Sequence, residues 1–188
     1  MKKKILEIKQ KYFFTIKPNI TNVIGIFLGS LLIAMLAQIS IYIPFSPVPI
    51  TGQTIGVLLV GGILGSRKGL LSVFAYISEG SLGLPVFAEM SAGLPVLLGP
   101  TGGYILSFIP AVFVIGYLSE RKYNKEIITS FISCILATFL ILGLGTLFLS
   151  LFFGLKKSLT MGFYPFIVVG LIKSFLSALI ITTYKKLS

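Results

Sequence analysis

Long apolar runs, separated by short segments rich in proline, glycine or charge, dominate the pattern of this chain. A helix that crosses the hydrocarbon of a bilayer needs about 20 residues, so runs of this length are typical of transmembrane helices. The pattern predicts one membrane domain over 19–188, preceded by a basic tail at 1–18. It is an all-α membrane fold whose six expected helices lie at about 23–43, 54–65, 69–80, 104–118, 127–153 and 164–184.

Two segments between these runs are broken by proline. Residues 44–54 (PFSPVPITGQT) hold three prolines, and residues 81–98 hold Pro85 and Pro95 in an otherwise apolar stretch. The second segment is too often broken by proline to span a bilayer and too apolar for a free surface loop. Irregular backbone at membrane depth is tolerated only where it packs on protein or lines a cavity. We therefore expect residues 81–98 to fold back as a re-entrant or capping segment.

The composition agrees with a membrane protein and excludes several classes of chemistry. Of the 188 residues, 55% are hydrophobic and 11% are charged, and mean hydropathy is +1.01; a soluble domain carries charge at about a quarter of its positions. The chain has no histidine and no aspartate, which excludes histidine-based triads and His-ligated metals. Cys134 stands alone and no nucleotide-binding G-x-x-x-x-G-K-[ST] motif occurs. We expect no catalytic residue, metal or cofactor, and ATP-driven work would need another chain.

The net charge of +11 is distributed as a topology signal and not as a nucleic-acid patch. Thirteen of the sixteen cations lie in the tail 1–18, in the second–third and fourth–fifth turns, and at the C-terminus. The opposite side holds Lys156 and Lys157. Because cytoplasmic loops carry the excess of Lys and Arg, we expect a multi-pass protein of the cell membrane with both termini cytoplasmic. The segments 44–54 and 81–98 would then face outward, and the tail would either lie on anionic lipid or stay solvated.

A single cation, Lys173, lies inside the last apolar run. A lysine at the centre of a membrane helix costs about 2.5–3.5 kcal/mol on insertion scales, and such residues are functional by default. Snorkelling to the surface is the alternative explanation. We expect Lys173 to contact a ligand, with Glu79 either pairing with it or accepting hydrogen bonds from the ligand; the alternative is a Glu79 that faces water. Glu89, in the long loop, is expected to be solvated.

The outer segments supply neutral polar and aromatic side chains, which suit a small apolar molecule with a few hydrogen-bonding atoms. Together with Lys173 and Glu79, the predicted substrate-binding residues are Gln53, Thr51, Tyr42, Phe87, Tyr104 and Phe163.

Small residues recur at four-residue spacing in the first helix, at Gly25 and Gly29 and again at Ser30 and Ala34. Such spacing lets helix backbones approach closely in lipid. The pattern fits internal packing and also fits a docking face for a partner membrane protein, and the residues alone leave both open.

Four blocks resemble the BioY family in their order and spacing: PVPITGQT at 47–54, GSRKG at 65–69, GLPVFA at 83–88 and LGPTGGY at 98–104. The resemblance runs from the first helix to the last, and the latter two blocks together are specific. It implies a six-helix S component of an energy-coupling-factor (ECF) transporter, which binds biotin from outside and is not an enzyme. It also implies a transmembrane coupling protein and two ABC-type ATPases as partners. The coupling protein would meet the small-residue face of the first helix, here Gly25, Gly29, Ser30, Ala34 and Ala37.

The block around Lys173 departs from the family pattern. The family reads close to PFLPGDLIK, whereas residues 165–173 read PFIVVGLIK, so Gly170 stands where the family carries an acid. If that acid holds the ureido N–H groups of biotin, its loss weakens binding or changes specificity. We hypothesise that Glu79, at a position expected to be neutral, supplies a relocated carboxylate. Lys173 would hold either the carboxylate of biotin or its ureido carbonyl.

Two other functions fit the residues less well. One keeps the transport class and changes the vitamin, because Gly170 breaks the usual motif. The other is a small intramembrane enzyme that acts on lipid, with Glu79 and Lys173 as acid and base. Only the enzyme predicts turnover by the purified chain alone.

Overall fold

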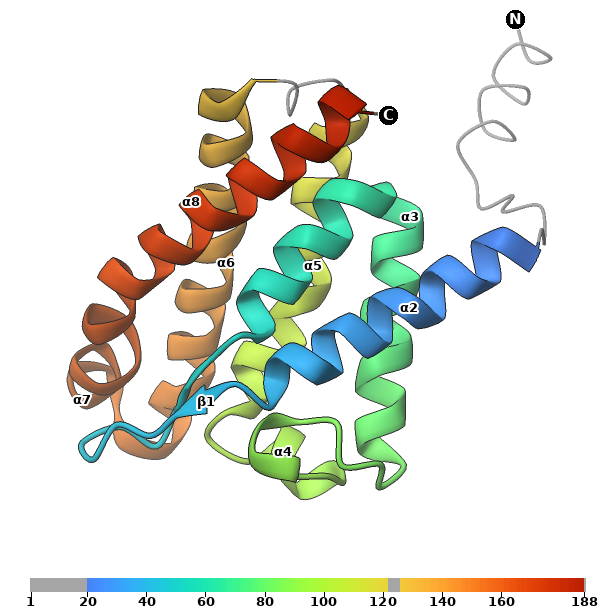
Figure 1. Ribbon diagram of the computed structural model, residues 1–188. Coiled ribbons are helices and arrows are strands. Elements are labelled where there is room, and N and C mark those ends of the chain that lie inside the picture. The colour runs from blue at the N-terminus through green and yellow to red at the C-terminus, as the bar shows by residue number, and fades with distance from the viewer. Residues whose placement is uncertain (1–19, 122–125, 188) are drawn as a thin grey trace, which may run out of the picture.

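The structure, a computed structural model, describes residues 20–121 and 126–187, so the predictions for the tail 1–18 lie outside the described residues. In these ranges the long helices are α2 (Ile20–Ala37), α3 (Gln53–Ser81), α5 (Gly102–Glu120), α6 (Ile127–Phe153) and α8 (Tyr164–Leu187) (Figure 1). The shorter elements are β1 (Ser40–Ile41), β2 (Ile50–Thr51), η1 (Ala88–Met90), α4 (Leu94–Leu98), α7 (Leu155–Ser158) and η3 (Leu159–Phe163). The predicted all-α fold is confirmed.

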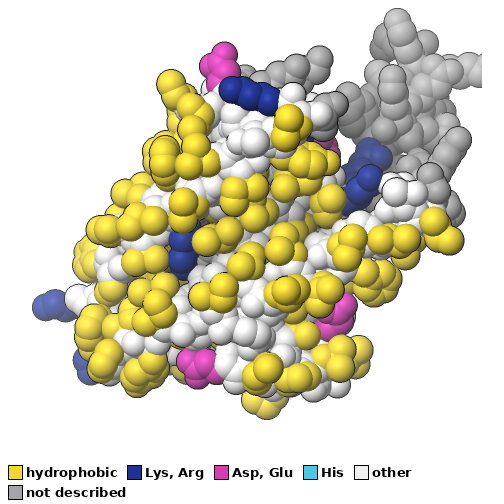
Figure 2. Space-filling model, viewed as in Figure 1, with side chains coloured by type: hydrophobic (Ala, Val, Ile, Leu, Met, Phe, Trp, Pro, Cys, Tyr) yellow, Lys and Arg dark blue, Asp and Glu magenta, His cyan; other side chains and the backbone are white. Residues whose placement is uncertain are grey.

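The surface of the described chain is that of a membrane protein. Five helices are long and apolar enough to cross a membrane, when α7, η3 and α8 are taken together as Leu155–Leu187. Large apolar side chains stand on their outer faces and cover much of the view in Figure 2. A soluble protein rarely exposes apolar patches of this extent, whereas lipid tails are as apolar as these side chains. The chain is therefore a multi-pass membrane protein.

Helix α3 contains both the second and the third predicted helices, because it folds back on itself. The Gln53 Nε2 atom donates a hydrogen bond of 2.6 Å to the Tyr76 hydroxyl, 23 residues further on. In a straight helix these residues would lie about 35 Å apart. The reversal occurs at Gly65, whose φ of 82° and ψ of 179° are not helical and favour glycine. The two arms hold about 12 and 16 residues, fewer than the ~20 of an ordinary span, so the six separate crossings stay a prediction.

Hydrogen bonds to Glu120, at the end of α5, hold this reversal in place. A Glu120 Oε1 atom accepts hydrogen bonds from the Ser66 backbone N–H, at 2.7 Å, and from the Ser66 hydroxyl, at 2.9 Å. The carboxylate thus satisfies a backbone donor where the second arm of α3 begins, as a capping side chain does. The contact is close because α5 has Gly116 at this point: a Cβ there would overlap the backbone of Ser66 and Gly65.

Most of the small-residue face of α2 packs against α3, which favours the internal-packing alternative, and the docking face stays a prediction. A Cβ at Gly29 would overlap the Ser72 side chain of α3, and Ser30, Ala34 and Ala37 are buried. These four residues therefore pack inside the described chain. At Gly25 an added Cβ would meet nothing within 4 Å.

The segment 81–98 folds back onto α3, as predicted. It is seated by Phe87, which is fully buried and meets the equally buried Tyr76 edge-on, with ring centroids 5.5 Å apart and an interplanar angle of 81°. A Cβ at Gly80 would overlap the Phe87 ring, so glycine makes this contact possible. The capping segment is therefore part of the core.

The two ends of the molecule differ in charge. The proline-rich segment forms a short antiparallel hairpin of β1 and β2, with Ser40 opposite Thr51, and this hairpin, α4 and α7 gather at one end (Figure 1). The reversal of α3 with Arg67 and Lys68, and the C-terminal end of α8, lie at the other. This separation matches the two sides that the distribution of cations predicts.

Candidate functional site

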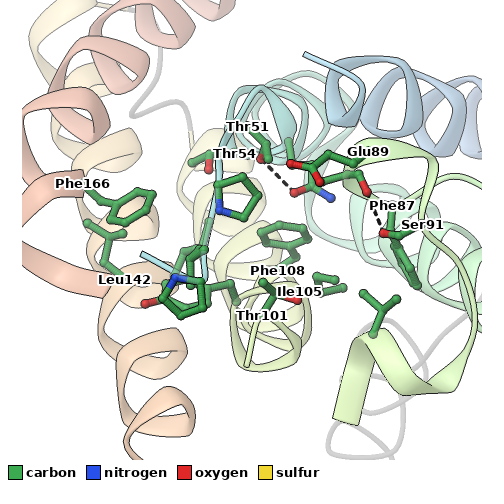
Figure 3. A pocket seen from close by; sticks show the side chains of 18 of the residues that line it. Thr51, Thr54, Phe87, Glu89, Ser91, Thr101, Ile105, Phe108, Leu142 and Phe166 are labelled. Atoms are coloured by element: carbon green, nitrogen blue, oxygen red, sulfur yellow. Dashed lines mark hydrogen bonds between the residues drawn. The ribbon is translucent and has the colours of Figure 1, made fainter. Parts of the chain in front are cut away.

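A cavity of about 280 Å³ opens beneath the hairpin and the capping segment. In Figure 3, Phe166 of α8 lies on one side of it, Phe87 and Glu89 of the capping segment lie on the other, and Phe108 of α5 lies between them. The lining therefore comes from elements far apart in the sequence, which the fold brings to the hairpin end.

Lys173 stands in the wall that α8 contributes. It lies seven residues, or about two turns, beyond Phe166, so both side chains share one face of α8. Its ammonium donates a hydrogen bond of 2.6 Å to the backbone carbonyl of Thr51 in β2. An ammonium has three N–H donors, and the described residues take one of them, so two are left for a guest. A buried cation needs such acceptors, and this contact draws Lys173 into the cavity and not toward a lipid headgroup.

A short chain of hydrogen bonds holds the polar side of the cavity in place. The Thr51 hydroxyl donates to Gln53 Oε1 at 2.8 Å, and Gln53 Nε2 donates to the Tyr76 hydroxyl at 2.6 Å. Both Thr51 and Gln53 line the cavity and are buried. Because their rotamers are fixed by these bonds, the site is ordered before any ligand binds, which reduces the entropy cost of binding.

Aromatic rings make most of the remaining wall. Phe87, Tyr104, Phe108 and Phe166 all line the cavity, and all are buried. The Tyr104 hydroxyl donates to the Gly162 carbonyl at 2.8 Å and lies 3.2 Å from the Thr146 hydroxyl. Its polar atom is thus satisfied away from the cavity. Apolar walls with a few placed polar groups are the usual make-up of a small-molecule site.

The capping segment is clamped to the end of α2 by Gln38. Its side-chain amide donates to the carbonyls of Ala34 and Phe87, both at 3.1 Å, and its Oε1 atom accepts from the Met90 backbone N–H, also at 3.1 Å. Beside this clamp Glu89 and Met90 have φ values of 58° and 57°. Non-glycine residues in this region cost about 1–3 kcal/mol each and persist only where their surroundings hold them.

A comparison with protein families decides what kind of protein has this cavity. The model of the BioY family matches residues 4–188. The chain belongs to the BioY family. The biotin transporter BioY of Thermotoga maritima is 41% identical over 148 residues, covering 78% of this chain and 86% of that protein. Biotin transporter BioY2 of Lactococcus lactis is 38% identical, covering 79% and 81%.

A solved structure agrees with the family assignment. The crystal structure of the S-component for biotin from an ECF-type ABC transporter superimposes with a TM-score of 0.82 at 28% identity, covering 92% of this chain and 95% of that one. The S-component fold, which the sequence blocks implied, is confirmed. BioY proteins are transport components and not enzymes, as expected.

The structure brings six of the eight predicted binding residues to the cavity of this BioY protein and leaves two elsewhere. The six are Tyr42, Thr51, Gln53, Phe87, Tyr104 and Lys173. Phe163 packs instead against Phe139 and Tyr164, with ring centroids 6.3 and 6.0 Å away.

Glu79 is the second exception, and its position does not support the hypothesis of a relocated carboxylate. Its Oε2 atom accepts a hydrogen bond of 2.6 Å from Ser30, so the carboxylate is turned toward α2, and Glu79 is not among the cavity residues. The structure shows no ion pair between Glu79 and Lys173, and it does not bring these two residues together as an acid and a base.

The family's missing acid also does not face the cavity directly. A Cβ at Gly170 would lie 3.0 Å from Thr138 Cγ2 and 3.7 Å from Leu142 Cδ1, both on α6. Beside it the Thr138 and Ser174 hydroxyls share a hydrogen bond of 2.9 Å. Gly170 itself is not among the residues that line the cavity, whereas Leu142 is.

Several lining residues escaped the sequence analysis. Phe108 lies one turn after Tyr104, and Phe166 lies two turns before Lys173, so helical spacing from these two predicted residues could have found them. Glu89 was interpreted as solvated. It is exposed, yet it lines the cavity, and the local sequence pattern gave no signal for this.

Proposed function

We propose that this chain is the biotin-binding S component of an ECF-type transporter and imports biotin into the cell. One observation supports this most: an aromatic cavity in which Lys173, the one cation among the described lining residues, uses one N–H donor on the described chain and has two for a guest. The similar proteins are named biotin transporters, and the similar solved structure is an S-component for biotin.

The chemistry of biotin suits this cavity. Its fused rings and alkyl chain are apolar and match the walls of Phe87, Phe108 and Phe166. Its polar atoms are confined to the ureido group and the carboxylate, and each offers an acceptor for Lys173. Thr54 and Gln53 also line the cavity and supply neutral polar groups to it. A charge-assisted hydrogen bond in such an enclosed site is worth about 1.5–3 kcal/mol.

The transport step needs partners. The chain has no nucleotide-binding motif, so we infer that a transmembrane coupling protein and two ABC-type ATPases drive it. Both termini and the α3 reversal would face the cytoplasm, and the hairpin and capping segment would face outward, because the cations gather at the former end. Biotin would enter from outside and be released inside when the ATPases act.

Uptake of labelled biotin tests this function. Cells that lack their own biotin uptake are given the chain together with the coupling protein and ATPases, or the same module with an ATPase inactivated. We expect accumulation with the complete module and its loss with the inactive one. Accumulation of another vitamin in place of biotin, or turnover of lipid by the purified chain, would contradict the proposal.

A further inference from the structure

We propose that Glu89 is the carboxylate that contacts the bound ligand and, together with Lys173, sets its orientation; this inference rests on the proposed binding of biotin. It gives Glu89 the role that the sequence analysis had assigned to Glu79.

Charge placement is the first argument. Among the described residues that line the cavity, Lys173 and Glu89 are the two charged ones. They come from different elements: Lys173 belongs to α8, where its ammonium is held at the Thr51 carbonyl, and Glu89 belongs to the capping segment. An anionic group of the guest is attracted by the ammonium and repelled by the carboxylate. A guest with a carboxylate at one end and N–H donors at the other therefore binds one way round, with its N–H groups toward Glu89.

The hydrogen bonding of the Glu89 carboxylate is the second argument. The described residues give it one hydrogen bond, from the Ser40 hydroxyl to Oε1 at 3.3 Å, which leaves Oε2 available. The two N–H groups of a ureido ring are donors that a carboxylate accepts through charge-assisted bonds. Glu89 can therefore hold the ligand without losing a structural contact.

The backbone at Glu89 is the third argument. Its φ of 58° is maintained by the Gln38 clamp on either side, at Phe87 and Met90. Strained residues held by their surroundings cluster at ligand clamps and active sites. Met90 has nearly the same φ but is not among the cavity residues, so it provides a control for the backbone alone.

Calorimetric titration of the purified full chain with biotin tests the proposal on four proteins: wild type, Glu89→Gln, Met90→Gly and Glu79→Gln. The glutamine at 89 keeps the size of the side chain and removes its charge. We expect Glu89→Gln to weaken biotin binding about tenfold, and the other two variants to stay within about twofold of wild type. Glu89→Gly, which removes the carboxylate and relieves the backbone, should show the same loss.

Biotin amide, which has a neutral tail, tests the orientation. If Glu89 contacts the ureido end, Glu89→Gln should weaken biotin and biotin amide by the same factor. Unchanged or tighter biotin binding by Glu89→Gln overturns the proposal, and tighter binding places the biotin carboxylate beside Glu89. A wild-type chain that does not bind biotin contradicts the proposed function instead, which keeps the two failures distinct.

Discussion

Lys173 carries its charge into an apolar region, and its surroundings have to offset the cost. The Thr51 carbonyl supplies one acceptor at 2.6 Å, and aromatic walls exclude much of the water that would supply others. We propose that a ligand acceptor completes the coordination of the ammonium, which would concentrate binding energy at this residue.

Replacing Lys173 should therefore have a large effect on affinity. We expect Lys173→Ala to weaken biotin binding more than tenfold, or by about 1.4 kcal/mol or more. Equilibrium binding of labelled biotin to the purified protein measures this. Lys157→Ala, at an exposed position of α7, is the matched control and should bind as wild type does; equal affinity of both variants would contradict the site assignment.

The residues that sequence reasoning found were those whose chemistry is out of place. A cation in an apolar run and polar groups beside prolines can be recognised in the sequence alone. Lys173, Thr51 and Gln53 were found in this way, and all three line the cavity. Apolar lining residues such as Phe166 are indistinguishable from core or lipid-facing ones until the helices are placed. Glu79 and Glu89 show the opposite error: one lies in the last turn of α3 and the other lies in the capping segment, and only the fold shows that Glu89 and not Glu79 lines the cavity.

At the scale of elements, the reversal of α3 depends on how closely α5 approaches it. Gly116 permits that approach, since a Cβ would overlap the backbone of Ser66. Gly116→Ala should destabilise the protein by about 1–3 kcal/mol, as overpacking does. Thermal unfolding in detergent measures the loss. Gly143→Ala, where an added Cβ meets nothing within 4 Å, should be neutral or gain up to about 1 kcal/mol from helix propensity.

The Gln38 clamp gives a second prediction at this scale. Gln38→Ala removes the hydrogen bonds that hold the Phe87 and Met90 backbone against α2. The capping segment then has to be ordered by the ligand, so we expect biotin to bind about three- to tenfold more weakly, mainly through faster dissociation. Stopped-flow or filter measurements give the dissociation rate; an unchanged rate would show that the clamp does not order the site.

Sequence predicted these elements unevenly for physical reasons. The break at residues 65–68 was visible because glycine and charge interrupt an apolar run, and the capping of 81–98 followed from prolines in apolar surroundings. The two-residue strands β1 and β2 are too short to leave a periodic signal. The small-residue stripe of α2 is ambiguous because close packing needs it whether the neighbour is α3 or another protein, and the burial of Ser30 and Ala37 favours α3.

At the scale of the whole molecule, the cavity and the reversal of α3 lie at opposite ends. The cavity opens beneath the hairpin and the capping segment, and the reversal of α3 with the C-terminal end of α8 lies opposite (Figure 1). Cys134 is buried, so a thiol reagent should not label it. Single cysteines placed at exposed positions can therefore show which side of the membrane each position faces. A membrane-impermeant maleimide should label Leu82→Cys in intact cells, and Leu187→Cys only after permeabilisation. The reverse pattern would contradict the proposed orientation.

Titration of the purified chain, without partner proteins, with biotin, thiamine and riboflavin tests the central claim most directly. We predict a saturable one-to-one isotherm with biotin and no binding heat with the other two vitamins. An isotherm with thiamine or riboflavin, or none with biotin from protein that is otherwise folded, would contradict the account.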